Sequence, residues 1–506
     1  MELQHNTRAL RTIEALSKTT ARVEARLEMR DGIRKVLQTS AKIYLAEHER
    51  EDSDVRINGR VVTRVVFIDE NGGYNSEERT NNFSEKVILS NSAAISDVLP
   101  NAHVIETKVV DTTAQSVDTV TSFEITLLGL AQREVKFIQG ATGEVEQLRE
   151  KTRVATFGQI VSQRFEVEER VDLDKSCEGI LSVDIVPALR EIVVGEGKMT
   201  AKGTAAINVL ATKRAEEAII YNDTIDFDFS KTIQAKFLKI DDTVFGAVTV
   251  ANLEIKSEQS QDRGPQLVIT AEFIFRGFSV ESAEVESLSD IFSFTNNLEL
   301  RHSDVDSVVV LPSTHTNIEV DSNLQMGEKS PFITRILSTS QSVVNSLTIV
   351  PANDKVTLEG QLSCAVVFEC EEKQIHSHTA IVPFSTSVKL DGVSASHSVQ
   401  AYATVQNCKV RARRGRELLV DARLAVSLSA TTQTTVRLVT DVAVGETKPA
   451  DDSAILIYTV GEGETLWDVA KRLGVRASEI LAQNNIQGEV STGERIFIYR
   501  QQVVNF

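Results

Sequence analysis

The chain contains few of the residues on which disulfide-stabilised and membrane-spanning proteins depend. Its 506 residues include only 4 cysteines and 8 prolines, and aromatic residues make up 5% of the chain. The cysteines, Cys177, Cys364, Cys370 and Cys408, form no CxxC pair, which argues against a disulfide framework or a cysteine-based metal site. No apolar run approaches the roughly 18 residues of a membrane span, and the first residues lack the pattern of a signal peptide. We therefore expect a soluble protein of a reducing cytoplasm.

The chain also has no excess of positively charged residues. The chain has 54 Lys+Arg against 72 Asp+Glu, a formal net charge of −18. Because nucleic-acid affinity comes largely from phosphate neutralisation, this balance argues against a nucleic-acid partner. With 42% apolar and 25% charged residues the composition is that of a globular protein, and the length suggests about three or four domains.

What the chain does contain is a threefold repeat of sequence markers. Each copy begins with an apolar and acidic lead-in, continues with an Ile-Leu or Val-Leu pair, and then has a glycine that opens an apolar strand. The lead-ins begin at Val23, Phe165 and Ile318, the pairs at Val36, Ile180 and Ile336, and the glycines are Gly59, Gly203 and Gly360. A later strand closes each copy, at 123–129, 267–275 and 418–426. Three markers in a constant order indicate three copies of one structural unit.

The local pattern within the copies is that of β-strands. Valine, isoleucine and threonine are abundant, apolar and polar residues alternate over 418–426, and Gly/Asn/Asp clusters such as 69–73 mark turns. We predict a mainly β protein with three tandem antiparallel β repeats, over residues 21–140, 160–290 and 315–443. Each repeat is expected to be a sandwich or an open barrel.

The first residues of the chain carry an ambiguous pattern. Residues that suit one face of a helix recur three and four apart, at Ile13, Leu16, Thr20, Val23 and Leu27. They fit one amphipathic helix over 7–29, whereas the repeat alignment makes 23–27 a strand. We predict a helical N-terminal segment over residues 1–20, followed by that strand.

Beyond a polar linker at 444–454, the pattern changes to that of a small module over 455–500. A short strand and a glycine-rich loop precede Thr465, which is placed to cap a helix with Asp468 three residues on. Gly474 is a natural end for that helix. A second helix and a closing strand complete a βααβ module.

The residues of this module resemble a LysM domain. The shared motif comprises Tyr458, Val460, Gly463, Thr465, Leu466, Trp467, Val469, Ala470, Val475, Leu481, Asn484, Gly493, Ile496 and Ile498. The chain departs from the family at Glu464, where Asp is usual, and at Thr492, where Pro is common. LysM domains bind N-acetylglucosamine polymers, such as peptidoglycan and chitin, in a groove between two loops. Carried over to this chain, the resemblance implies a groove formed by Gly461, Glu462, Gly463, Glu464, Thr465, Leu466, Asn484, Asn485, Ile486, Gln487 and Gly488. Much of this motif is also needed for the turn, the cap and the core, whatever the module binds.

Three β repeats ahead of one LysM module are similar to the SPOCS-domain spore coat morphogenetic proteins of endospore-forming bacteria, of the SipL type. The family often has a Pro-Asp-(Ile/Val) step before the second marker, where this chain reads Asp-Gly-Ile at 31–33, Cys-Glu-Gly at 177–179 and Pro-Phe-Ile at 331–333. The resemblance implies a protein in the mother-cell cytoplasm, at the forespore surface and spore coat. It also implies that the LysM domain docks onto the coat basement-layer ATPase of the SpoIVA type.

No motif for catalysis is present. His376 and His378 lie on one face of a predicted strand, but no third metal ligand is apparent. The sequence 195–197 (Gly-Glu-Gly) lacks the Lys-Ser/Thr ending of a phosphate loop, and no Gly-x-Ser-x-Gly elbow occurs. We expect no enzyme, no catalytic residue, no metal site and no cofactor.

One basic run stands out near a predicted turn. Its members are Lys409, Arg411, Arg413, Arg414 and Arg416. The run is either a solvated turn and strand edge or a docking patch for an acidic partner or a neighbouring repeat. It lacks the interleaved aromatic residues of a site that stacks nucleic-acid bases.

Three functions remain in order of preference. The leading hypothesis is a non-enzymatic structural protein of endospore coat assembly, with the β repeats as scaffold and LysM as the docking module. The alternative is a peptidoglycan-binding protein that acts through LysM at the spore cortex or cell wall, which would require export. A peptidoglycan-processing enzyme comes third, because no hydrolase domain fits the repeats.

Overall fold

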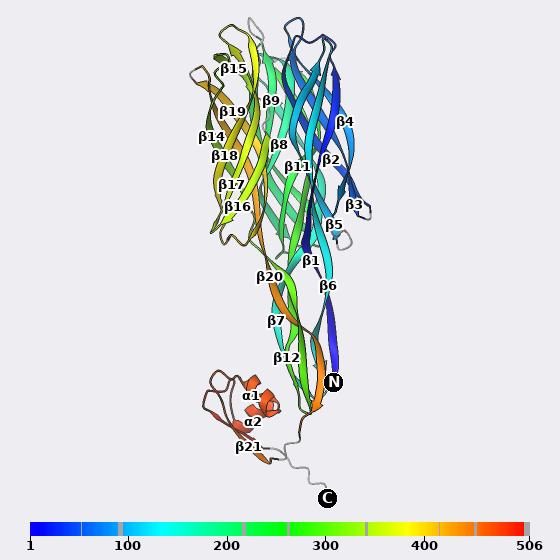
Figure 1. The fold of residues 1–506 in the computed structure, drawn as a ribbon, viewed down its shortest axis with the longest axis vertical. Helices are drawn as coiled ribbons and strands as arrows, with labels where there is room; N and C mark the ends of the chain where they lie inside the picture. Colours follow the sequence, from blue (N-terminus) through cyan, green and yellow to red (C-terminus); the bar gives the residue numbers. More distant parts are fainter. Residues whose placement is uncertain are drawn as a thin grey trace.

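The computed structural model describes residues 1–51, 53–89, 95–214, 219–260, 264–339, 343–413, 415–449 and 453–499. Antiparallel strands make up most of it, and both described helices lie in the C-terminal module (Figure 1). The first repeat contains β1 (Glu2–Glu28), β2 (Lys35–Glu51), β3 (Asp54–Ile68), β4 (Tyr74–Ile88), β5 (Ile95–Thr112) and β6 (Ser116–Thr142). The second contains β7 (Val145–Asp172), β8 (Cys177–Gly195), β9 (Lys198–Lys213), β10 (Ile219–Gln234), β11 (Thr243–Ser260) and β12 (Gly264–Ser293). The third contains β13 (Asn296–Val310), β14 (Thr314–Gln325), β15 (Ile333–Thr339), β16 (Val343–Ala352), β17 (Lys355–Cys370), β18 (Ile375–Lys389), β19 (Ser398–Arg413) and β20 (Glu417–Thr447).

Each repeat is a sandwich of two antiparallel sheets, which confirms the predicted fold class. In the first repeat the sheet β1-β6-β5 faces the sheet β2-β3-β4, and Ile57 and Ile125 from the two sheets share one buried core. In the second repeat β7-β12-β11 faces β8-β9-β10, with Ile207 and Phe273 in the common core. The third repeat has the same order, except that two of its strands are in two pieces: β13 and β14 both pair with β20, and β15 and β16 both pair with β17. Pro312 lies between β13 and β14 and has no N–H with which to continue the ladder.

The three sequence markers occupy equivalent strands in the three sandwiches. The lead-ins lie in β1, β7 and β14, the pairs in β2, β8 and β15, and the glycines in β3, β9 and β17. Each marker glycine is directly paired with a phenylalanine on the next strand, as Gly59–Phe83, Gly203–Phe229 and Gly360–Phe384. A Cβ added at Gly203 would lie 2.5 Å from Cζ of Phe229 and 2.1 Å from the Ala188 carbonyl oxygen. The repeat therefore keeps glycine where an aromatic ring crosses the strand.

Replacing Gly203 by alanine is expected to lower the free energy of unfolding by about 1–3 kcal/mol, because ring and backbone must move apart. Urea unfolding followed by circular dichroism measures the change. Gly195→Ala is the matched control, since a Cβ there would come no closer than 3.8 Å to another atom. Equal midpoints for the two variants would contradict this explanation of the marker.

The three sandwiches pack around a common axis in the upper part of the molecule. Leu37, Leu181 and Leu337, the leucines of the second marker, meet in one buried cluster. The same cluster contains Val66, Leu210 and Val367, each of which lies seven positions after a marker glycine. The repeats are therefore related by an approximate threefold axis that passes between β2, β8 and β15.

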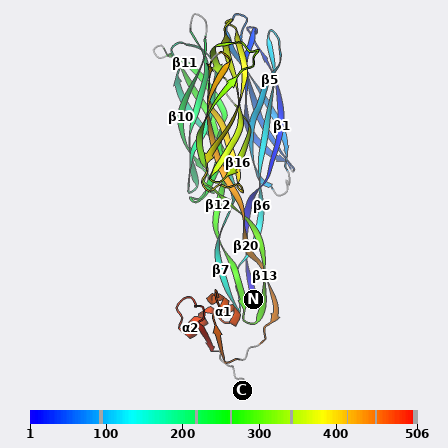
Figure 2. The same ribbon diagram turned by 60° about the vertical axis from the view of Figure 1, so that its left-hand side comes forward.

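Below the sandwiches, the longest strands continue into a stalk (Figures 1 and 2). One antiparallel pair comes from each repeat: β1 with β6, β7 with β12, and β13 with β20. The buried side chains of the stalk come from all three repeats. One cluster contains Ile138 of β6, Leu288 of β12 and Val439 of β20. The stalk is thus a shared core to which every repeat contributes.

The prediction of a helix over residues 1–20 is wrong, because these residues form β1 and pair with β6 along its length. The reason lies in a register shift between Ile13 and Ala15. Leu10 is buried before the shift and Ser17 after it, so the buried side changes from even to odd positions. When a strand contains such a bulge, residues on one face can lie three positions apart in the sequence, which is also the spacing expected for one face of a helix.

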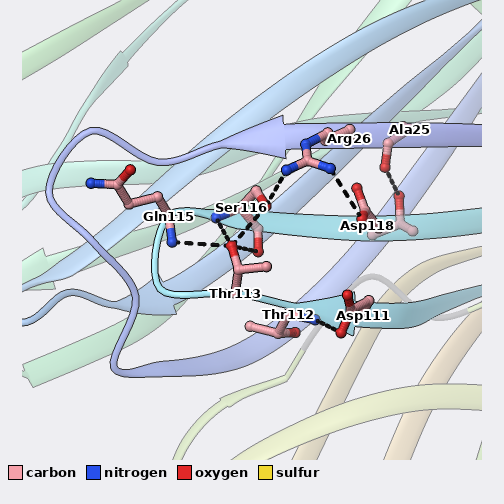
Figure 3. A network of polar contacts seen from close by, with 9 residues as sticks. Ala25, Arg26, Asp111, Thr112, Thr113, Gln115, Ser116 and Asp118 are labelled. Carbon is pink, nitrogen blue, oxygen red and sulfur yellow. Dashed lines mark hydrogen bonds and ion pairs between the residues drawn. The ribbon is translucent and has the colours of Figure 1, made fainter.

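The far end of β1 is fixed to the turn between β5 and β6, as Figure 3 shows. The Thr113 hydroxyl accepts hydrogen bonds from the backbone N–H groups of Gln115 (3.3 Å) and Ser116 (3.0 Å). Arg26 of β1 donates to Ser116 Oγ (3.1 Å) and forms an ion pair with Asp118 (3.7 Å). These contacts hold the end of β1 in the sheet.

The strands also run past the predicted repeat limits. Residues 145–159 belong to β7 and residues 296–310 to β13, and both segments build the stalk. The predicted linker at 444–454 begins too early, because β20 continues to Thr447. Among the described residues, no helix is long and apolar enough to cross a membrane.

Candidate functional site

The C-terminal module is a two-stranded sheet covered on one face by two helices. It contains β21 (Ile455–Thr459), α1 (Leu466–Leu473), α2 (Ala477–Asn484) and β22 (Arg495–Tyr499). Its core is formed by Val460, Val469, Ala470, Val475, Ile480, Ile496 and Ile498.

The predicted cap of α1 is confirmed. Thr465 Oγ1 accepts a hydrogen bond from the backbone N–H of Asp468 (3.2 Å), and Asp468 accepts one from the backbone N–H of Thr465 (2.9 Å). The hydrogen bonds from Thr465 lower the pKa of the Asp468 carboxyl. Gly474 ends the helix in the left-handed conformation, with φ of 62°. The loop before α1 is therefore held in one conformation.

Glu464, in the first predicted groove loop, is already bound within the module. Its carboxylate accepts hydrogen bonds from the Tyr458 hydroxyl (2.6 Å) and from the backbone N–H of Gly461 (2.8 Å), and it forms an ion pair with Arg472 (2.8 Å). The Tyr458 hydrogen bond, followed by that from Gly461, lowers the pKa of Glu464. The Glu462 side chain in the same loop is exposed.

Asn484, in the second predicted groove loop, joins α2 to β22. Its side chain donates to the carbonyl oxygens of Ile480 (2.9 Å) and Phe497 (2.8 Å) and accepts from the Phe497 N–H (2.7 Å). Asn485 ends α2 with φ of 50°, and the side chains of Asn485 and Gln487 are exposed. Within the predicted groove, Glu464 and Asn484 thus have structural partners, while exposed polar groups remain on both loops.

The sheet face away from the helices is apolar and exposed, a feature that the sequence analysis missed. Ile455 is paired with Tyr499 and Ile457 with Phe497, and their exposed fractions are 56%, 57%, 62% and 37% in that order. We call these four residues the outer sheet face. The signal was the presence of apolar residues at consecutive positions in both strands, which is unusual for a sheet with one face in water.

The helix face of the module packs against the tip of the stalk. Asp290 of β12 accepts a hydrogen bond from Trp467 Nε1 (2.8 Å) and forms an ion pair with Lys471 Nζ (2.7 Å). Phe292 of the same strand belongs to the core of the module, with its ring centre 5.2 Å from that of Trp467. The module is therefore fixed in orientation, and its outer sheet face points away from this junction.

Replacing Asp290 by serine is expected to weaken this junction by about 1.5–3 kcal/mol, because it removes the charged acceptor of two donors. The emission of Trp467, the only tryptophan in the chain, should shift to longer wavelength as its indole gains water. Asp304→Ser, at an exposed stalk position, is the control. An unchanged spectrum for Asp290→Ser would show that the junction does not depend on this carboxylate.

The basic run lies where β19 ends and β20 begins, and the arginines of the run that the structure describes have nearby partners. Arg411 pairs with Asp421 (2.5 Å) and Arg413 with Glu417 (4.0 Å). Further along, Arg416 donates to the Ser330 carbonyl oxygen (2.7 Å) and lies over Phe332 (4.2 Å). Lys409 is exposed, and Arg414 lies outside the described residues. A docking role for this run stays a prediction.

The remaining candidate groups form no reactive centre in the described part of the chain. His376 stacks on Phe368, with ring centres 5.8 Å apart. The four cysteines form no disulfide with one another in the described structure, and three of them are buried. No group of three or more His, Cys, Asp or Glu residues within the described ranges has the arrangement to hold a metal ion.

Comparison with protein families identifies two parts of the chain. Residues 333–413 match the SPOCS domain of SipL, and residues 458–498 match the LysM domain. No curated protein and no solved structure matches the chain. The first match covers β15 to β19 of the third repeat, and the first two repeats share its strand order. The two families fit a sporulation protein with a peptidoglycan-binding module. The chain therefore contains a SPOCS domain of the SipL family in its third repeat and a LysM domain in its C-terminal module.

Proposed function

We propose that this chain is a non-enzymatic structural protein of endospore coat assembly, in the mother cell at the forespore surface. Its three sandwiches and stalk form a scaffold. Its LysM domain docks through the outer sheet face onto the coat basement-layer ATPase of the SpoIVA type. The observation that carries this proposal is the outer sheet face itself, formed by Ile455, Ile457, Phe497 and Tyr499.

The energetics favour a protein partner at this face. An apolar side chain gains about 1.5–3 kcal/mol when it is fully buried, and contiguous exposed apolar side chains mark protein contacts. Tyr499 adds a hydroxyl at the edge of the patch, which suits an interface with an apolar centre and a polar rim. The other face of the module is already occupied by the stalk tip, so the outer sheet face is the apolar surface that remains.

The stalk supports a scaffold role because it connects the LysM module rigidly to the three sandwiches. Strand β12 continues from the second sandwich to the stalk tip, where Asp290 and Phe292 contact the LysM helices. A partner bound to the outer sheet face would thus have a fixed orientation relative to all three repeats. Neither matched family is enzymatic, which agrees with a structural role.

The second candidate is peptidoglycan binding through the predicted groove. It is supported by the LysM match and by the exposed polar side chains of Glu462, Asn485 and Gln487 on the two loops. Glu464 and Asn484 support it less, because their polar atoms are bonded inside the module. Sugar binding would therefore rely on backbone groups and on the exposed side chains.

Capture from sporulating cells separates the two candidates. The bait is the full chain in three forms: wild type, a face variant (Ile457→Ser with Tyr499→Ser) and a groove variant (Glu462→Ala with Gln487→Ala). We expect the wild type and the groove variant to retain the coat ATPase and the face variant to lose it. Retention of the ATPase by the face variant, with insoluble peptidoglycan bound by wild type and lost by the groove variant, would favour the second candidate.

A further inference from the structure

A polar layer lies next to the leucine cluster on the approximate threefold axis. Gln38 and Ser338 directly follow the axial leucines in their repeats, as does Ser182 in the second repeat. All three residues line one cavity of about 430 Å³. The rest of its wall comes mainly from β10, β15 and β19, so the cavity extends from the axis to the boundary between the second and third repeats.

Several buried polar atoms on this wall lack a hydrogen-bond partner among the described residues. They include Gln38 Oε1, Ser338 Oγ and Gln406 Oε1. Gln406 is 1% exposed and Ser338 3% exposed, so bulk water does not reach these side chains. An unsatisfied buried polar group costs about 1–3 kcal/mol, and three in one cavity point to an occupant that pairs with them.

The charges around the cavity nearly cancel. Asp184 is paired with Lys42 and Arg64, and Arg411 is paired with Asp421. The other charged wall residues, Asp223 and Lys409, carry opposite charges. No charge on the wall is therefore left for an ionic ligand to neutralise, so the cavity favours a neutral ligand.

The rest of the wall is a bonded frame with an apolar side. The Asn208 and Asn222 amides donate to the carbonyl oxygens of Gln406 (3.1 Å) and Thr339 (2.9 Å), and Leu210 and Ile220 supply the apolar side. The groups left for a ligand are the two unpaired glutamine oxygens, which accept hydrogen bonds, and the Ser338 hydroxyl, which both donates and accepts, and sugar hydroxyls can pair with all three. The volume falls within the usual range of small-ligand sites, about 300–1,000 Å³.

We propose that this axial cavity binds a neutral, hydroxyl-rich ligand of monosaccharide size. The ligand enters between β10 and β19, where the exposed side chains of Asn222, Asp223, Lys409 and Arg411 line the wall. It pairs with Gln406 and Ser338 at the buried end and bridges all three repeats. The site is separate from the LysM groove and does not depend on the docking function proposed above.

Equilibrium dialysis of the full chain with labelled glucose and labelled N-acetylglucosamine tests the proposal. We expect saturable binding of at least one of them, at one site per chain, with a dissociation constant below about 10 mM. The comparison of the two sugars shows whether the acetamido group contributes. Gln406→Met keeps the side-chain volume and removes the amide, so it should weaken binding at least about tenfold.

Controls distinguish this cavity from other sites. Gln325→Met, at an exposed strand position, and the groove variant of LysM should both bind as wild type does. Ser338→Ala provides a second cavity variant if Gln406→Met does not fold. No saturable binding of either sugar, equal binding by the cavity variants, or loss of binding in the groove variant would each overturn the proposal.

Discussion

Replacing Asp184 by alanine is expected to lower the free energy of unfolding by about 3–5 kcal/mol, because it leaves the buried Lys42 unpaired and Arg64 with Glu78 as its remaining carboxylate. Asp184 of β8 contacts Lys42 of β2 and Arg64 of β3 (3.3 Å), and Arg64 also contacts Glu78. The three side chains of this triad are only 8%, 20% and 12% exposed. The triad therefore joins the first and second repeats across a buried boundary.

The triad also gives stability a pH dependence. Burial alone would raise the pKa of Asp184, but the charges of Lys42 and Arg64 outweigh it and lower that pKa. A carboxyl with a depressed folded-state pKa stabilises the protein above its unfolded pKa of about 3.9. That contribution is lost as the pH falls through the folded-state value, so wild type should lose stability below about pH 4 more steeply than Asp184→Ala.

Thermal and urea unfolding of matched variants measure the effect. Asp228→Ala is the control, because the Arg190–Asp228 pair is exposed and should be worth at most about 1 kcal/mol. The double variant Lys42→Met with Asp184→Leu should recover much of the loss, since it removes one buried charge of each sign. If Asp184→Ala behaves like Asp228→Ala, the triad does not hold the two repeats together.

The second large effect is expected at the outer sheet face. Ile457→Ser together with Tyr499→Ser should weaken binding of the purified full chain to the purified SpoIVA-type ATPase at least about 100-fold, because two anchors of about 1.5–3 kcal/mol each are lost. Surface plasmon resonance at moderate salt measures the dissociation constant. Both side chains are more than half exposed, so neither contributes to the module core.

Two controls accompany this measurement. The groove variant Glu462→Ala with Gln487→Ala should bind the ATPase as wild type does. The Trp467 emission of the face variant should match that of wild type, which shows that the module is folded and still seated on the stalk. A groove variant that loses the ATPase, with a face variant that keeps it, would place the contact at the loops instead.

The sequence predicted the units of this fold but not their association. The markers at Val36, Ile180 and Ile336 located one strand in each sandwich, because alternation and turn residues are local signals. The meeting of Leu37, Leu181 and Leu337 on one axis depends on contacts between residues more than 140 positions apart. No local pattern records such contacts, so the arrangement of the repeats was not predictable.

The stalk and the outer sheet face were missed for related reasons. Residues 296–310 carry none of the shared markers, and the shift between Ile13 and Ala15 hid the strand period of β1. In the LysM module the cap at Thr465 followed from its sequence. The exposure of Ile457 did not, because apolar strand residues are assigned to a core when no structure shows which face is covered.

Site-specific photo-cross-linking in sporulating cells tests the central claim most directly, that the LysM domain docks a coat protein through its outer sheet face. A photoreactive residue is placed at position 457 of the full chain or, as control, at position 487 in the second groove loop. We expect position 457 to cross-link to the SpoIVA-type basement-layer ATPase and position 487 to give little or no such product. A cross-link from position 487 to the ATPase or to peptidoglycan, with none from position 457, would contradict the account.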